Sequence, residues 1–218
     1  MKIRNMKHVI LFGVTGSIGN YIIKALETLN DVRLTLFVRN SLKLSKEQKE
    51  KHRIIEGDVM NYKNVKDALK GQDIVYFGLS GNLDAMVKNI IKAMKETDVK
   101  KIIAISSMGI YGASWKATLC RKKDAPGFLN SIMLTVMKPM FRQHRKLADI
   151  VENSGLDYTI LRPGRFTYDD EISYQITYKG EPELGRDISR KSIAHFVMKI
   201  VKAPEQFTNQ NISLTKGV

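Results

Sequence analysis

The chain has 218 residues, one cysteine, and 36 basic against 22 acidic side chains, which gives a formal net charge of +14. This length suits one domain with a continuous core. One cysteine excludes an internal disulfide, which fits a reducing compartment. The apolar run at 9–12 is too short for the hydrophobic region of a signal peptide, so we expect a cytoplasmic protein. No stretch approaches the ~20 apolar residues that a membrane-spanning helix needs. The positive charge favours anionic ligands, but the basic residues are spread along the whole chain, a pattern that does not favour nucleic acid as a partner.

Short apolar runs alternate with helical patterns along the chain. The predicted strands are 7–12, 33–38, 53–55, 73–77, 101–105 and 158–161, and apolar residues recur at helical spacing over 18–29, 83–94, 141–154 and 192–201. This alternation predicts a single α/β domain over residues 1–218, a Rossmann-type doubly wound parallel sheet in the order 3-2-1-4-5-6 with helices on both faces. Residues from about 164 to 189 lose the rhythm and contain several glycines, so we expect an irregular segment on the substrate side.

A glycine-rich loop joins the first predicted strand to the first predicted helix. Its glycines, Gly13, Gly16 and Gly19, suit a tight turn, a close backbone approach to a pyrophosphate, and close packing of helix on strand. The free N–H groups at the start of the helix and the positive end of its dipole face the phosphates. This context predicts nucleotide binding rather than a purely structural turn, and the loop residues assigned to the cofactor also include Thr15, Ser17 and Ile18.

The residues after the second predicted strand distinguish the two nicotinamide cofactors. An acidic side chain there accepts from the ribose 2′-hydroxyl of NAD(H) and repels the 2′-phosphate of NADP(H). The run Phe37-Val38-Arg39-Asn40 contains no acid, and the guanidinium of Arg39 suits paired hydrogen bonds to a phosphate, with Lys43 close by. NADP(H) is therefore predicted over NAD(H), the alternative being that Arg39 is a solvated surface charge.

Two further strand ends carry candidate cofactor residues. Asp58 and Val59, after the third strand, suit contact with the adenine, although Asp58 suits equally a cap of the next helix. Leu79, Ser80 and Gly81, after the fourth strand, are expected to line the central portion of the cofactor.

Two later runs complete the pattern: SSMGIYG at 106–112 and GLDYTILRPG at 155–164. Together with the glycine loop they resemble the atypical short-chain dehydrogenase/reductase superfamily, most closely its NmrA-like and biliverdin reductase B-like (flavin reductase) branch. The resemblance runs over nearly the whole chain and implies an NAD(P)-binding Rossmann fold. It also implies that Ser106 lies at the cofactor site and that Pro163 contributes backbone contact with the nicotinamide end.

The chain departs from the catalytic Tyr-x-x-x-Lys pair of dehydrogenases and epimerases in that superfamily. The tyrosine position falls on Met140 and the lysine position on His144. A thioether cannot donate a proton, so the usual route of alcohol oxidation is not supported. His144 is a candidate proton donor or ribose contact, with a surface histidine as the alternative.

Ser107 and Tyr111, just beyond the fifth strand, are the other catalytic candidates. Either serine of the pair at 106–107 serves alternatively only to satisfy local backbone groups. No cluster of metal ligands is visible in the sequence.

Two functions agree with these features. A quinone or flavin accepts hydride into a delocalised anion and needs little from an enzyme acid, which favours an NADP(H)-dependent oxidoreductase that reduces a flavin, a quinone or a similar conjugated acceptor. The alternative is a non-catalytic NmrA-like regulator that binds the dinucleotide, senses its redox state and binds a protein partner. A monomer and a homodimer are both compatible with the sequence.

Overall fold

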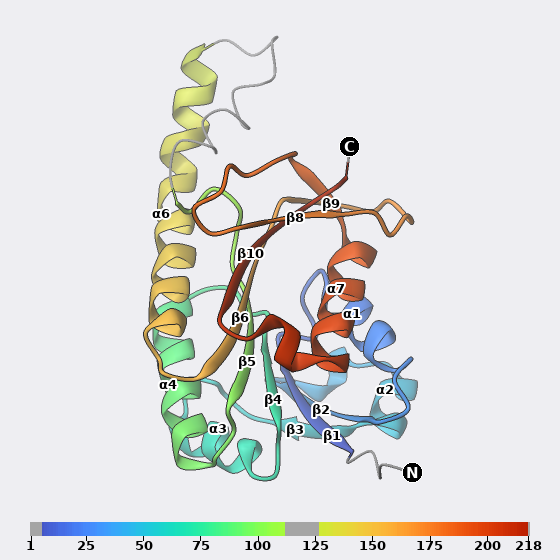
Figure 1. Ribbon diagram of the computed structural model, residues 1–218. Coiled ribbons are helices and arrows are strands. Elements are labelled where there is room, and N and C mark those ends of the chain that lie inside the picture. The colour runs from blue at the N-terminus through green and yellow to red at the C-terminus, as the bar shows by residue number, and fades with distance from the viewer. Residues whose placement is uncertain (1–5, 112–126, 218) are drawn as a thin grey trace.

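The computed structural model describes residues 6–111 and 127–217, with backbone only over 127–137. Eight strands form one sheet in the order β3-β2-β1-β4-β5-β6-β10-β8 (Figure 1). Every neighbouring pair is parallel except β8, which runs antiparallel to β10. The predicted order 3-2-1-4-5-6 is thus confirmed. The strands of this sheet are β1 (Lys7–Phe12), β2 (Val32–Val38), β3 (Arg53–Glu56), β4 (Ile74–Phe77), β5 (Lys101–Ile105), β6 (Asp157–Pro163), β8 (Gln175–Tyr178) and β10 (Gln210–Thr215).

Helices cover both faces of the sheet (Figure 1). One face carries α1 (Gly19–Leu26) and α7 (Arg190–Lys202), and the other carries α3 (Tyr62–Leu69), α4 (Leu83–Glu96) and α6 (Gly127–Glu152). The remaining helical elements are α2 (Lys46–Lys51) and the 3₁₀ turns η1 (Ser41–Lys43) and η2 (Pro204–Phe207).

The central strands are buried on both faces, which explains their continuous apolar sequences. In β1, Val9 and Leu11 pack in the core on the α1 and α7 side, whereas Ile10 and Phe12 pack in the core under α3, α4 and α6. A strand with helices on both faces therefore shows no alternation of apolar and polar residues. The two cores, one on each face of the sheet, position the loops at the sheet edges.

The segment from 164 to 189 is more regular than the sequence predicts. It contains β7 (Arg165–Thr167), β8 and β9 (Asp187–Ser189), and β7 pairs with β9 in a small separate sheet. These strands are three or four residues long and their partners lie far along the chain, so they carry no usable local pattern. The last strand, β10, was likewise not predicted, and α6 begins well before residue 141.

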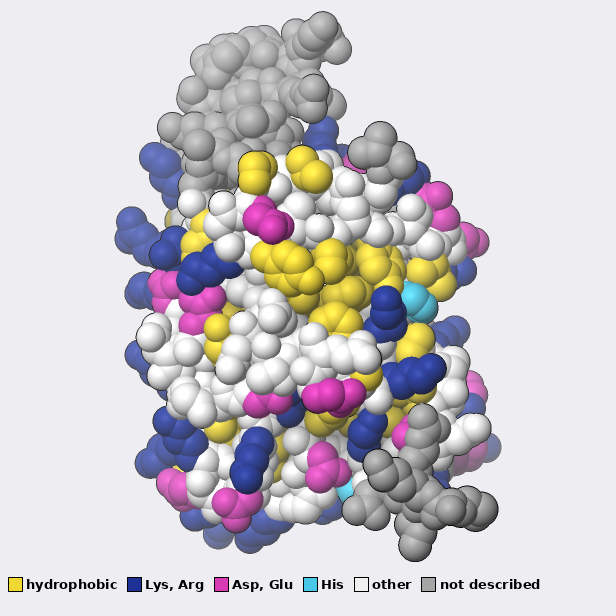
Figure 2. Space-filling model, in the orientation of Figure 1, with side chains coloured by type: hydrophobic (Ala, Val, Ile, Leu, Met, Phe, Trp, Pro, Cys, Tyr) yellow, Lys and Arg dark blue, Asp and Glu magenta, His cyan; other side chains and the backbone are white. Residues whose placement is uncertain are grey.

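No helix in the described ranges is long and apolar enough to cross a membrane. On the face shown in Figure 2, apolar side chains gather over the region of β8, β10 and α7, and basic and acidic side chains are interspersed around it. The basic residues on this face do not form one continuous patch.

Candidate functional site

The predicted cofactor residues all follow strands that run parallel, so the fold brings them to the same edge of the sheet, where ligands bind in open α/β folds. Gly13 to Gly19 follow β1, and Arg39 follows β2. The residues that follow the next four strands are Asp58 and Val59 (β3), Leu79, Ser80 and Gly81 (β4), Ser106 and Ser107 (β5), and Pro163, which ends β6.

Two of the three loop glycines are required by packing. Gly13 has a φ of +99°, and a Cβ there would overlap the carbonyl of Gly78, at the end of β4. A Cβ on Gly19 would overlap the carbonyl of Val14. By contrast, Gly16 is exposed and its Cβ would lie 3.2 Å from the carbonyl oxygen of Gly13. Gly16 is therefore the position where a side chain changes the ligand surface with the least change to the fold.

The loop contains backbone N–H donors that have no partner among the described residues. The N–H groups of Gly16 and Gly19 donate to carbonyls within the loop at 3.1 Å, whereas those of Thr15, Ser17 and Ile18 have no partner among the described residues. No side chain caps the start of α1. Free donors at the positive end of a helix dipole form an anion site, which fits a dinucleotide pyrophosphate.

Two exposed basic residues, Arg39 and Lys43, follow β2. Arg39 is exposed directly after β2. Lys43 lines a hollow of about 460 Å³ together with Thr15 and Gly16. The same hollow is also lined by Lys24, Glu27 and Glu47, so it carries charges of both signs.

The structure also brings an acid to this region that sequence reasoning missed. The Oε2 atom of Glu56, at the end of β3, accepts from the backbone N–H of Ser41 at 3.0 Å. Hydrogen bonds from the side chain and backbone of Ser41 lower the pKa of Glu56. The predicted neighbourhood of β2 and β3 in the sheet could have located Glu56, because pairing of these strands places Glu56 beside Val38 at the end of β2.

The two residues predicted to meet the adenine have other contacts. Asp58 accepts from the backbone N–H of Met60 at 2.9 Å, so its carboxylate forms the turn before α3. Val59 is 5% exposed and packs in the core. Leu79 is half-buried after β4, and Ser80 and Gly81 are exposed there.

The serines after β5 differ in accessibility. Ser106 is buried, and its hydroxyl donates to the backbone carbonyl of His144 at 3.0 Å. Ser107 is half-buried and donates to the carbonyl of Met108 at 3.2 Å. The backbone N–H of Met108 in turn donates to the carbonyl of Pro163 at 3.0 Å, which joins the ends of β5 and β6. Ser106 thus holds α6 against the sheet, and Ser107 remains the more accessible hydroxyl.

His144 lies on α6 beside this edge. Its Nδ1 atom is buried and has no hydrogen-bond partner in the part of the chain that the structure describes. Burial lowers the pKa of His144 below its ordinary value of 6.5. The imidazole is therefore neutral at pH 7, where it suits hydrogen bonding better than acid catalysis. Met140, one turn earlier, is 39% exposed.

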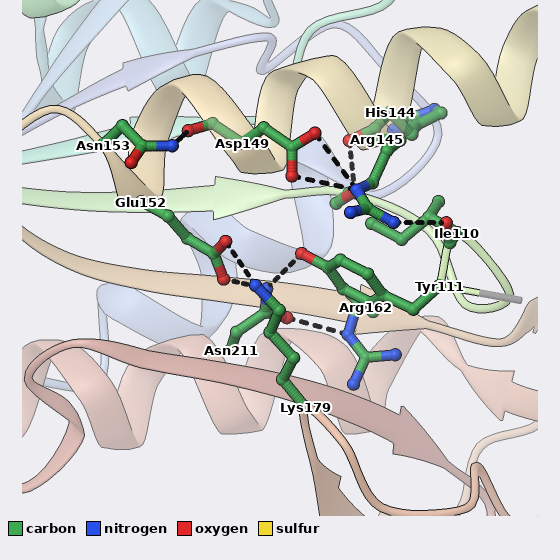
Figure 3. Close-up of polar contacts among 11 residues, drawn as sticks. Ile110, Tyr111, His144, Arg145, Asp149, Glu152, Asn153, Arg162, Lys179 and Asn211 are labelled. Atoms are coloured by element: carbon green, nitrogen blue, oxygen red, sulfur yellow. Dashed lines mark hydrogen bonds and ion pairs between the residues drawn. The ribbon is translucent and has the colours of Figure 1, made fainter.

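The hydroxyl of Tyr111 points toward Asn211 (Figure 3). Its hydroxyl accepts from Nδ2 of Asn211 at 2.7 Å, and Asn211 pairs with Ile160 well before the ends of β10 and β6. The guanidinium of Arg145 lies 4.4 Å and the ammonium of Lys179 4.8 Å from the centre of the ring. Burial and the carboxylate of Glu152 raise the pKa of Tyr111 to about 12. These contacts place Tyr111 in a cluster with Asn211, Arg145 and Lys179, and the catalytic role predicted for it stays a prediction.

A buried ion pair next to this cluster fixes the segment after β6. Arg162 is 1% exposed; its guanidinium pairs with the carboxylate of Glu183 and donates through Nε to Asn211 at 2.8 Å. Glu183 also accepts from the backbone N–H of Gly109 at 2.8 Å. The pair therefore ties the 164–189 segment to the loop after β5. The arginine within the apolar strand 157–163 was the sequence signal for it.

A parallel sheet with a glycine loop of free N–H donors at its carboxyl edge defines the chain as a Rossmann-type dinucleotide-binding protein. The model of the NAD(P)H-binding family matches residues 13–204, and the chain belongs to that family.

Solved structures agree with this assignment. A Rossmann-fold NAD(P)-binding family protein from Shigella flexneri is 36% identical, with 98% of each chain covered and a TM-score of 0.77. A short-chain dehydrogenase/reductase from Veillonella parvula in complex with NADP is 21% identical over 96% of this chain and 94% of the other, with a TM-score of 0.81. ChuY, an anaerobillin reductase from Escherichia coli, is 20% identical over 96% and 97% of the two chains, with a TM-score of 0.78.

Proposed function

We propose that the chain is an NADP(H)-dependent oxidoreductase that reduces a flavin, a quinone or a similar conjugated acceptor. The observation that carries this proposal is the pair of residues at the Tyr-x-x-x-Lys position. Met140 has no proton to give, and burial keeps His144 neutral at pH 7. A site without a strong acid suits an acceptor that takes hydride into a delocalised anion, because water then supplies the remaining proton.

The proposed roles of the residues follow from their positions. The free N–H groups of the glycine loop bind the pyrophosphate, and bound NADPH supplies the hydride. The hydroxyl of Ser107 hydrogen-bonds the acceptor at the carboxyl edge, and the neutral imidazole of His144 hydrogen-bonds the nicotinamide ribose. Their contribution is positioning, which can supply much of a hydride-transfer rate in a site that excludes water.

The preference for NADP(H) over NAD(H) is part of the proposal. Arg39 and Lys43 are cations at the adenosine end of the loop, which suits a 2′-phosphate. Glu56 opposes them, but its bond to the Ser41 N–H directs at least one carboxylate oxygen to the protein. The named NADP complex of a relative supports this preference.

The test is oxidation of NADPH by the purified protein, followed by loss of NADPH absorbance, with quinones, free flavins and aldehydes as acceptors. Gly16→Asp is the binding-dead control, because the position is exposed and the added carboxylate repels a pyrophosphate. We expect turnover with the conjugated acceptors, none with aldehydes, and none in the control.

His144→Ala separates positioning from proton donation. A positioning role predicts a raised KM for NADPH and a rate profile without a titration near the ordinary pKa of histidine. NADPH binding without turnover of any acceptor would contradict the oxidoreductase and support the dinucleotide-sensing regulator.

A further inference from the structure

Three basic residues are buried among the described residues, and they differ in their partners. Lys101, 4% exposed, pairs with Asp157 at 2.9 Å, and Arg162 pairs with Glu183. Arg190, 8% exposed, forms no ion pair with a carboxylate in the part of the chain that the structure describes. A buried charge without a counter-charge is costly, so the place of Arg190 requires an explanation.

The contacts of Arg190 connect the glycine loop to the segment after β6. Its Nε donates to the carbonyl of Ser17 at 3.2 Å, and its Nη1 donates to the carbonyl of Thr167 at 2.9 Å. The ring of Tyr168, itself 78% exposed, lies 3.9 Å from the guanidinium carbon. A guanidinium carries five N–H donors, and these contacts use two of them, which leaves three.

The position of Arg190 within its helix is electrostatically unfavourable in the absence of an anion. It is the first residue of α7, where the helix dipole is positive and acidic side chains are preferred. The first turn of α7 has no acid, and the next residue, Lys191, is neutralised by Asp170 at 2.6 Å. The start of α1, with its free N–H groups at Ser17 and Ile18, lies on the other side of the Arg190 contact. The guanidinium of Arg190 thus adds its positive charge to the positive end of the α1 dipole.

We propose that Arg190 is a binding residue for the dinucleotide pyrophosphate and that, with Tyr168, it couples the glycine loop to the segment after β6. The pyrophosphate supplies the counter-charge that the protein itself does not. The proposal rests on dinucleotide binding by the family, and not on the acceptor or on the preference between NADPH and NADH.

The test measures binding of NADPH and NADH to the full chain by titration calorimetry at low and high salt. Arg190→Met removes the charge at similar length, and Arg190→Lys keeps it. We expect the methionine variant to lose affinity for both dinucleotides by about ten- to hundredfold and to respond less to salt than the wild type. The lysine variant is expected to keep the salt response of the wild type and to bind more tightly than the methionine variant.

Two outcomes would overturn the proposal. The first is an unchanged dinucleotide affinity in Arg190→Met. The second is an equal loss of affinity in both variants with the salt response of the wild type, which would show that Arg190 only supports the local structure. If the methionine variant does not fold, Tyr168→Ala decides, because an exposed ring can be removed without opening the core. A weaker affinity for NADPH in Tyr168→Ala supports the proposed role of Arg190 and Tyr168, and an unchanged affinity overturns it. These experiments measure binding alone, so a failure of the proposed reaction would leave their result intact.

Discussion

Removing the carboxylate of Glu183 tests how the segment after β6 is held in place. Glu183→Gln keeps the shape of the side chain and its acceptor oxygen for the N–H of Gly109, but it removes the charge that faces Arg162. Arg162 is 1% exposed, and the side chain of Glu183 is 6% exposed, so the guanidinium left behind cannot be solvated without opening the structure.

The expected loss is large for a single polar substitution. Breaking a buried ion pair by removal of one partner costs about 3–5 kcal/mol. Whole domains are stable by only about 5–15 kcal/mol. At roughly 2–4 °C per kcal/mol for a domain of 150–250 residues, Tm falls by about 6–20 °C.

The assay is urea unfolding followed by circular dichroism, with Arg162→Met/Glu183→Gln as the matched control. Because the double variant carries no buried charge at this site, we expect it to be more stable than Glu183→Gln alone. A loss below about 1 kcal/mol in Glu183→Gln would refute the reasoning, because that is the value of a solvent-exposed pair. The reasoning would also be refuted if the double variant lost more free energy of unfolding than the two single variants lose in sum.

Three further predictions follow from the site. Gly16→Asp should abolish measurable NADPH binding with little change in Tm. Gly19→Ala should lower Tm by several degrees, because the added Cβ overlaps the carbonyl of Val14. Thermal melts with and without NADPH compare the two variants. Arg39→Met should weaken NADPH by about tenfold or more and leave NADH nearly unchanged, and an equal loss for both would contradict its contact with the 2′-phosphate. Because burial lowers the pKa of His144 from 6.5, the unfolded chain gains the proton first as pH falls below that value. His144→Leu should therefore lose less free energy of unfolding between pH 7 and about pH 5 than the wild type does. If urea unfolding gives the same dependence of this free energy on pH for both proteins, the pKa of His144 in the folded state is not lowered.

Burial on both faces made the central sheet predictable. The apolar runs Val9–Phe12 and Ile102–Ile105 make up most of β1 and β5 and end where the strands end, because the middle of a strand under helices on both faces needs apolar residues; each strand nevertheless begins at a lysine. The strands β7, β8, β9 and β10 escaped prediction because their stability comes from distant partners. Asp187, for example, faces Arg165 across a separation of 22 residues through paired hydrogen bonds of 2.8 Å.

The residues of the candidate site likewise fall into those that the sequence could predict and those that it could not. Residues directly after a parallel strand must lie at the carboxyl edge, so the glycine loop and Arg39 could be placed from the sequence. Tyr111 lies six residues beyond β5, and the sequence does not specify which way the chain turns over that distance. The hydroxyl of Tyr111 meets Asn211, 100 residues further along the chain. Arg190 was missed for the same reason, although a basic residue at the start of a helix was a usable signal.

The net charge of +14 acquires a more local meaning in the structure. At physiological salt an exposed charge acts over about 8 Å, so lysines on the far faces of α4 or α6 contribute to solubility more than to ligand capture. The cations that we propose to act on a dinucleotide lie near the carboxyl edge, and they include Arg39, Lys43 in the hollow beside Thr15 and Gly16, and Arg190 beside the free donors of the loop. Because Arg190 is buried, salt screens its charge less than that of Arg39. If both residues bind the dinucleotide as proposed, their contributions to affinity differ in salt response, and we expect the contribution of Arg39 to weaken first as ionic strength rises.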